Sequence, residues 1–161
     1  MVGTSLLGVV VGGVIALAGF VVRDVLQEWR DKKKRRADKF EELVAAVYEF
    51  DHWIEAARDR YVYGRDVPET VSPFAKVQSI SSIYFPQFRA LVGELNSAAL
   101  MYGVWMTGAQ GKRLNGFANF NDGFKDVIGP YINARDALLD ALQKFAREHF
   151  QDEEPQGPKA S

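Results

Sequence analysis

The most suggestive pair of residues for chemistry is a carboxylate and an imidazole three positions apart. Glu49 and His52 occur in the stretch Glu-Phe-Asp-His, and this spacing places both on one face of a helix, as di-iron helical bundles require. Such bundles also need a second pair of this kind and two more inward glutamates. The other histidine, His149, has Ala146 at the matching position. We therefore interpret Glu49 and His52 as surface residues and predict no metal site.

A second candidate for chemistry is the glycine-rich stretch that ends in Lys112 and Arg113. It resembles a phosphate-binding loop, but Arg113 replaces the Ser or Thr that would bind magnesium, and no strand precedes the stretch. We interpret residues 108–112 as a turn between helices. The chain has no cysteine and two histidines, so hydrolytic chemistry has no evident nucleophile or base. The sequence predicts no catalytic residue and no cofactor.

A third candidate is a group of asparagines interleaved with Phe117 and Phe120, at the predicted start of the last helix. Asparagine is favoured in turns and at helix starts, which accounts for the group as local capping. The alternative is a polar recognition patch at one end of a helical bundle. The patch would consist of Asn115, Asn119 and Asn121.

The elements that must position these residues begin with an uncharged head. Residues 1–22 contain no ionisable side chain, and 22 helical residues reach roughly 33 Å, enough for a hydrocarbon core of about 30 Å. No positive charge precedes the apolar run, which disfavours a cleaved signal peptide. A buried core helix is rarely so uniformly apolar. We predict that residues 1–22 form a transmembrane helix in contact with the lipid bilayer.

A basic segment, residues 23–39, follows the head and predicts its orientation. It holds eight Lys or Arg against four Asp or Glu, and positive charge beside a span is retained on the cytoplasmic side. The N-terminus is then outside the inner (plasma) membrane and the rest of the chain is cytoplasmic. The topogenic residues, which also attract lipid headgroups, are Lys32, Lys33, Lys34, Arg35 and Arg36. Because the span explains them, we expect no specific nucleic-acid partner.

Small residues are spaced along one face of the predicted span. Gly8, Gly12 and Ala16 are four apart and Gly19 is three further on. Such a face lets two membrane helices approach closely, which favours self-association. The alternative is that glycine is simply frequent in membrane helices.

Apolar residues recur at helical spacing through the rest of the chain, residues 40–150, and predict a core that includes Leu95, Leu138 and Leu142. The pattern predicts a first helix that continues from the span to about Tyr63, a second over 73–107, kinked at Pro86, and a third over 117–150, kinked at Pro130. Two shorter helices meeting at Pro86 are the alternative for the second. Residues 151–161 have few apolar side chains, which predicts a disordered tail. The fold class is all-α: a single transmembrane helix that continues into a cytoplasmic antiparallel bundle of three long helices.

These features favour a non-enzymatic, membrane-anchored interaction or scaffold module. Its predicted partners are a second copy of the chain, in a homo-oligomer, or another protein whose identity the sequence does not give. Two alternatives remain. One is a membrane-active effector that perturbs or perforates the bilayer, and the other is an enzyme with an unusual helical site. The abundant aromatic residues are interpreted as core packing, with a ligand pocket or partner groove as the minority interpretation.

Overall fold

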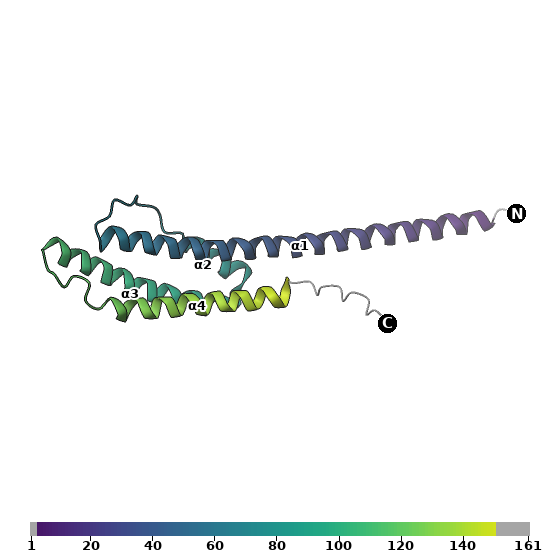
Figure 1. Cartoon of the computed structure of the whole chain (residues 1–161). Helices are drawn as coiled ribbons and strands as arrows, with labels where there is room; N and C mark the ends of the chain where they lie inside the picture. The colour runs from purple at the N-terminus through teal and green to yellow at the C-terminus, as the bar shows by residue number, and fades with distance from the viewer. Residues whose placement is uncertain (1–2, 151–161) are drawn as a thin grey trace, which may run out of the picture. The chain divides into compact units, whose positions relative to one another are not determined.

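A computed structural model describes residues 3–150 of the chain, and for residues 3–26 it describes the backbone alone. Residues 1–2 and the predicted tail, 151–161, lie outside the described residues. Within them the chain is all-helical (Figure 1). The elements in chain order are α1 (Gly3–Tyr61), α2 (Phe74–Tyr84), the short 3-10 helix η1 (Pro86–Phe88), α3 (Arg89–Leu114) and α4 (Phe124–His149).

The chain divides into two compact units, Met1–Asp38 and Lys39–Ser161. The first unit contains the predicted span, residues 1–22, whose side chains lie outside the described ones. Among the described residues, no helix is long and apolar enough to cross a membrane. The second unit contains all of the described hydrophobic core, and the rest of the structural description concerns this unit, which we call the body.

The predicted continuous first helix is confirmed, because α1 runs without interruption to Tyr61. No proline or glycine lies between Phe20 and Tyr63 to break it. Gly64 follows with a φ of 67°, a left-handed conformation that glycine adopts without steric cost. A Cβ atom at Gly64 would lie 2.6 Å from Arg113 Nη1. The first turn of the chain therefore favours glycine for its backbone conformation, and the flexible end of Arg113 would have to shift to admit a Cβ atom there.

The predicted continuous helix over residues 73–107 is wrong, and the alternative of two helices meeting at Pro86 is correct. Phe85, with φ −137° and ψ 59°, leaves the helical region because the ring of a following proline disfavours helical geometry at the preceding residue. The Ser72 hydroxyl accepts a hydrogen bond at 3.3 Å from the N–H of Phe74, the first residue of α2.

The break at Pro86 reverses the chain, which changes the expected topology. The ring of Phe74, at the start of α2, lies 5.0 Å from Phe50, while Phe85, after its end, lies 5.6 Å from Phe40. α2 is thus antiparallel to α1. α3 then returns parallel to α1, and α4 is antiparallel to it, since Phe145 contacts Phe40 at 5.4 Å. The body is an up-down-up-down bundle whose second helix is short, rather than three long antiparallel helices.

The turn between the last two helices lies later in the chain than predicted. Residues 108–112, interpreted as a turn, belong to α3, which ends at Leu114. Its end is a Schellman motif: Gly116 has φ 77°, its N–H donates to the Arg113 carbonyl, and the Phe117 N–H donates to the Lys112 carbonyl. α4 begins at Phe124 rather than 117 and continues through Pro130. The predicted turn at residues 108–112 is therefore wrong, because α3 accommodates Gly108 and Gly111 within the helix.

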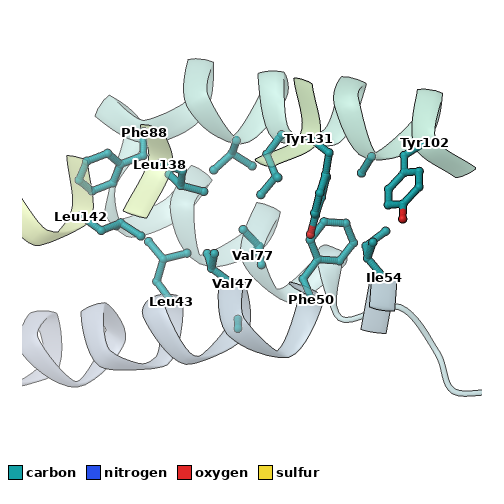
Figure 2. Close-up of a cluster of buried hydrophobic side chains, with 14 of the residues drawn as sticks. Leu43, Val47, Phe50, Ile54, Val77, Phe88, Tyr102, Tyr131, Leu138 and Leu142 are labelled. Atoms are coloured by element: carbon teal, nitrogen blue, oxygen red, sulfur yellow. The ribbon is translucent and has the colours of Figure 1, made fainter. Parts of the chain in front are cut away.

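The core lies where the apolar spacing placed it. Leu95 and Leu138 are fully buried and Leu142 is 1% exposed. Figure 2 shows Leu43, Val47, Phe50 and Ile54 of α1 pointing toward side chains of the other elements. Each long helix contributes buried residues along one face, and in α1 and α3 they recur at alternating steps of three and four, as in knobs-into-holes packing. In α3 the row is Val92, Leu95, Ala99, Tyr102, Met106 and Ala109.

Candidate functional site

One charged cluster connects α1 and α4 inside the bundle. The Tyr131 hydroxyl donates to Asp51 Oδ1 at 2.9 Å, and Arg135 Nη1 donates to both Asp51 carboxylate oxygens, at 3.2 and 3.1 Å. Tyr131 and Arg135 are four residues apart, so both face Asp51 across the interface. Arg135 also donates to Asp136 at 2.9 Å. The hydrogen bonds of these side chains are thus formed within the cluster itself.

Tyr131 and Arg135 of this cluster both keep their protons at neutral pH. Burial, followed by the neighbouring Asp51 carboxylate, raises the pKa of Tyr131 far above its usual value. The hydroxyl therefore stays protonated and acts as a hydrogen-bond donor. Burial lowers the pKa of Arg135, but hydrogen bonds to Asp136 and Asp51 outweigh it and the net shift is upward. A general acid or base needs a pKa near the working pH, and neither group has one.

A second polar position in the core is Tyr102 on α3, which is 1% exposed. Burial raises its pKa, while the nearby Arg58 guanidinium opposes that shift. Within the described residues, the Tyr102 hydroxyl and the Nε atoms of Arg58 and Arg113 have no hydrogen-bond partner of good geometry. The buried polar atoms at this end of the bundle therefore have fewer hydrogen bonds than those of the Asp51 cluster.

The short α2 leaves an open groove beside it. α2 begins only at Phe74, so the furrow between α1 and α3 has no helix over it beyond that residue. The result is a groove of about 500 Å³ with walls from both helices. We call it the α1–α3 groove. Among its walls are Trp53, Tyr61, Leu100 and Val104, and no Asp, Glu, His, Lys or Arg lines it.

Two further hollows have charged rims. One, of about 660 Å³ between α1 and α4, is lined by Phe40 and Leu139 but also by Glu41 and Asp140. The other, between α3 and α4, includes Glu94. The α1–α3 groove is therefore the most apolar of the three.

The predicted topogenic residues are exposed. Lys32, Lys33, Lys34, Arg35 and Arg36 all lie on α1 with exposed side chains, and Lys32 pairs with Glu28 at 2.7 Å. The predicted self-association residues, Gly8, Gly12, Ala16 and Gly19, lie in the segment whose side chains are outside the described ones. The roles assigned to both groups stay predictions.

The asparagine group forms local hydrogen bonds in and around the turn over residues 115–123. Asn115 Nδ2 donates to the Gly111 carbonyl at 2.7 Å, and Asn119 Nδ2 donates to Asp122 Oδ2 at 3.0 Å. The main-chain carbonyl of Asn121 accepts a hydrogen bond from the Phe124 N–H at 3.3 Å. These bonds are typical of turn chemistry, and a recognition role for the exposed side chains stays a prediction.

Glu49 and His52 each lie beside another charged residue. Glu49 pairs with Lys76 of α2 at 3.6 Å, whereas the His52 ring lies 4.0 Å from Glu55. Across the residues that the structure describes, no three His, Asp or Glu side chains form a group able to hold a metal ion.

Sequence reasoning missed two features: the link between Asp51 and Arg135, and the α1–α3 groove. Asp51 and Arg135 both lie beside the apolar row of their helix rather than in it, a position that many solvated residues share. Their pairing could be found only once the register of α1 on α4 was known. The groove depends on where α2 begins, and the predicted long second helix concealed it.

Within the described residues the body is an all-helical bundle, and the Asp51 cluster joins its helices α1 and α4. Comparison of the chain with protein-family models, curated proteins and solved structures finds no match.

Proposed function

We propose that the chain is a single-pass, membrane-anchored helical interaction module without enzymatic activity of its own, with its N-terminus outside and its body cytoplasmic. The observation that carries this proposal is the charge step after residue 22. Residues 1–22 contain no ionisable group, and eight Lys or Arg follow within residues 23–39. An apolar stretch of this length followed by positive charge is typical of a span with its C-terminal side in the cytoplasm.

The body supports an interaction role through its surface. It presents the uncharged α1–α3 groove, and three large apolar side chains of α3 are 62–71% exposed: Leu100, Met101 and Val104. Exposed apolar surface of this kind is typical of sites where proteins bind one another. The Asp51 cluster, in contrast, is occupied by its own hydrogen bonds.

The anchor and its orientation are tested with reporters fused after Ser161. A reporter active only in the cytoplasm should work, and one active only outside should not. Replacing Lys32, Lys33, Lys34, Arg35 and Arg36 by Gln should weaken this bias, because those charges retain the segment inside. A chain lacking residues 1–22 should leave the membrane fraction. A C-terminus found wholly outside would contradict the proposal.

A membrane-active effector is the second candidate, favoured by the spacing of Gly8, Gly12 and Ala16. Replacing Gly8 and Gly12 by Leu keeps the segment apolar but places bulky side chains where two helices would meet. We expect membrane insertion to persist while span-dependent association falls. If overexpression of the parent dissipates the membrane potential and the double variant does not, the effector becomes the better proposal.

A further inference from the structure

The basic segment of α1 separates its charges between two sides of the helix. One line of residues at seven-residue steps is acidic: Asp24, Asp31 and Asp38. A second line at the same spacing contains Val22, Trp29 and Arg36. The two lines are offset by two residues, or roughly 200° around a helix with 3.6 residues per turn, so they lie on opposite sides. We call the side that carries Trp29 and Arg36 the tryptophan face.

The tryptophan face combines one large aromatic ring with basic side chains. Trp29 is 62% exposed, and Lys33 Nζ lies 5.9 Å from the centre of its ring. Lys33 and Arg36 follow Trp29 by four and seven residues on this face, and both are exposed. In the sequence, Val25 and Leu26 precede Trp29 by four and three residues, so they share its side of the helix. The composition of this face is thus apolar toward the predicted span and basic beyond it.

Packing within the protein does not explain an aromatic ring at this position, because residues 27–36 are all exposed. Tryptophan is enriched at the headgroup level of membranes, since its ring is apolar and its N–H is polar. Lysine and arginine close to a membrane surface attract anionic headgroups. The order of apolar, aromatic and basic residues along one side of a helix is therefore typical of contact with an anionic membrane surface.

The distance from the predicted span to Trp29 also fits such a contact. Trp29 follows residue 22 by seven residues, which is roughly 10 Å along a helix axis, whereas the headgroup layer is about 5–8 Å thick on each side of a bilayer. An upright helix would hold residue 29 just beyond the headgroups. A tilt of about 20°, the average for membrane helices, brings the tryptophan face down into that layer. Helical side chains also point toward the N-terminus, which the proposed anchor places in the membrane.

We propose that the tryptophan face, with Trp29, Lys33 and Arg36, binds anionic lipid headgroups, and that α1 leaves the membrane tilted toward this face. The Trp29 ring lies among the headgroups, and the two cations contact their phosphates. The aspartates on the opposite side are thereby held away from like charge. This inference rests on the proposed anchor and adds a lipid class and a side of the helix. Orientation of the span depends on how many basic residues follow it, whereas headgroup binding depends on which side they occupy.

The first experiment measures tryptophan fluorescence of the full chain in phosphatidylcholine vesicles whose acyl chains are brominated near the headgroup, because bromine quenches a ring that it contacts. The chain has three tryptophans, so the signal of Trp29 is the difference between the parent and Trp29→Phe. The control combines Trp29→Phe with Gln27→Trp, on the opposite side and two residues closer to the span. We expect stronger quenching at position 29 than at position 27. Equal or stronger quenching at position 27 would overturn the proposal.

The second experiment adds phosphatidylglycerol to the same vesicles and compares two charge-matched variants. Quenching of Trp29 should rise in the parent and in Lys34→Gln with Arg35→Gln, whose changes lie off the tryptophan face. It should not rise in Lys33→Gln with Arg36→Gln, which also removes two charges.

Equal responses of the two double variants would overturn the inference, because charge alone and not its side would then matter. Alkaline carbonate extraction of the same vesicles keeps the two proposals separate. A chain that resists extraction but shows no difference between its two sides removes only this inference, whereas a chain that is extracted overturns the anchor, and the tilt with it.

Discussion

The two ends of the body's core are built from different aromatic chemistry. At one end Phe40, Phe85, Phe88, Phe145 and Phe150 pack mainly on each other, with ring centroids such as Phe40–Phe150 5.2 Å apart. Toward the other end lie Tyr102, Tyr131 and Trp105, whose rings carry polar atoms, and two of the three form hydrogen bonds. Tyr131 donates to Asp51 and Trp105 donates to the Asp122 carbonyl.

This difference indicates that the stability of the bundle and the register of its helices depend on different ends of the core. Contacts among phenylalanine rings depend mainly on buried area and vary gently with position, so they stabilise the bundle without strongly fixing how its helices slide. A hydrogen bond to the partly buried Asp51 carboxylate has narrow geometric limits. We infer that the phenylalanine end contributes more to stability, and that the Asp51 cluster fixes the register of α4 on α1. Three changes test this comparison.

The largest effect is expected at the phenylalanine end. Phe85 is fully buried and contacts the rings of Phe40, Phe88 and Phe145. Phe85→Ala should lower the free energy of unfolding by about 3–5 kcal/mol, because it removes a ring and leaves a cavity. Ile83→Ala, at a 70% exposed position two residues earlier, should change it by less than about 0.5 kcal/mol. Denaturant unfolding of the full-length protein measures both, and similar losses would mean that Phe85 is not a core residue.

A smaller effect is expected at the Asp51 cluster. The side chains of Arg135 and Asp51 are 26% and 18% exposed, so breaking their link should cost about 1–3 kcal/mol. A double-mutant cycle with Asp51→Ala and Arg135→Ala should give a coupling energy of more than about 1 kcal/mol, in the upper part of the range for residues that share one network.

The matched control is the pair Arg65–Asp59, whose arginine is 64% exposed. Its coupling should be about 0.2–1 kcal/mol, as for other exposed pairs. Equal coupling in the two cycles would remove the distinction between the Asp51 cluster and an ordinary surface ion pair.

The smallest effect depends on pH. The pKa of Tyr131 is raised in the folded chain by burial and by Asp51, so above the ordinary tyrosine pKa of about 10 only the unfolded chain loses this proton. The stabilisation is complete below pH 10 and declines as the pH rises beyond it. At neutral pH, Tyr131→Phe should cost about 1 kcal/mol through the lost hydrogen bond.

Above pH 10 that cost should shrink, because phenylalanine cannot ionise. Melting temperatures of the parent and Tyr131→Phe between pH 8 and 11 measure the trend. Tyr48→Phe, at a 51% exposed position, should follow the parent across the whole range. A constant difference between the parent and Tyr131→Phe would show that Tyr131 ionises as freely in the folded body as in the unfolded chain.

Local patterns were sufficient to predict much of the body. The rows of apolar residues at three- and four-residue steps identified the helical class and the core positions Leu95, Leu138 and Leu142, because this spacing is set by the geometry of a single helix. The absence of breakers from Phe20 to Tyr63 likewise predicted an uninterrupted α1. The charge step that predicts an anchor is also a property of sequence alone.

Tertiary structure decided what depends on how the helices meet. Pro86 permits either a kink or a reversal, and only the packing of Phe74 on Phe50 and of Phe85 on Phe40 selects the reversal. The glycines at 108 and 111 satisfy a turn or a helix equally well locally. The pairing of Asp51 with Arg135 and the opening of the α1–α3 groove follow from the register and from the short α2. Periodicity fixes which face of a helix is apolar, but the direction and neighbours of that helix are set by long-range contacts.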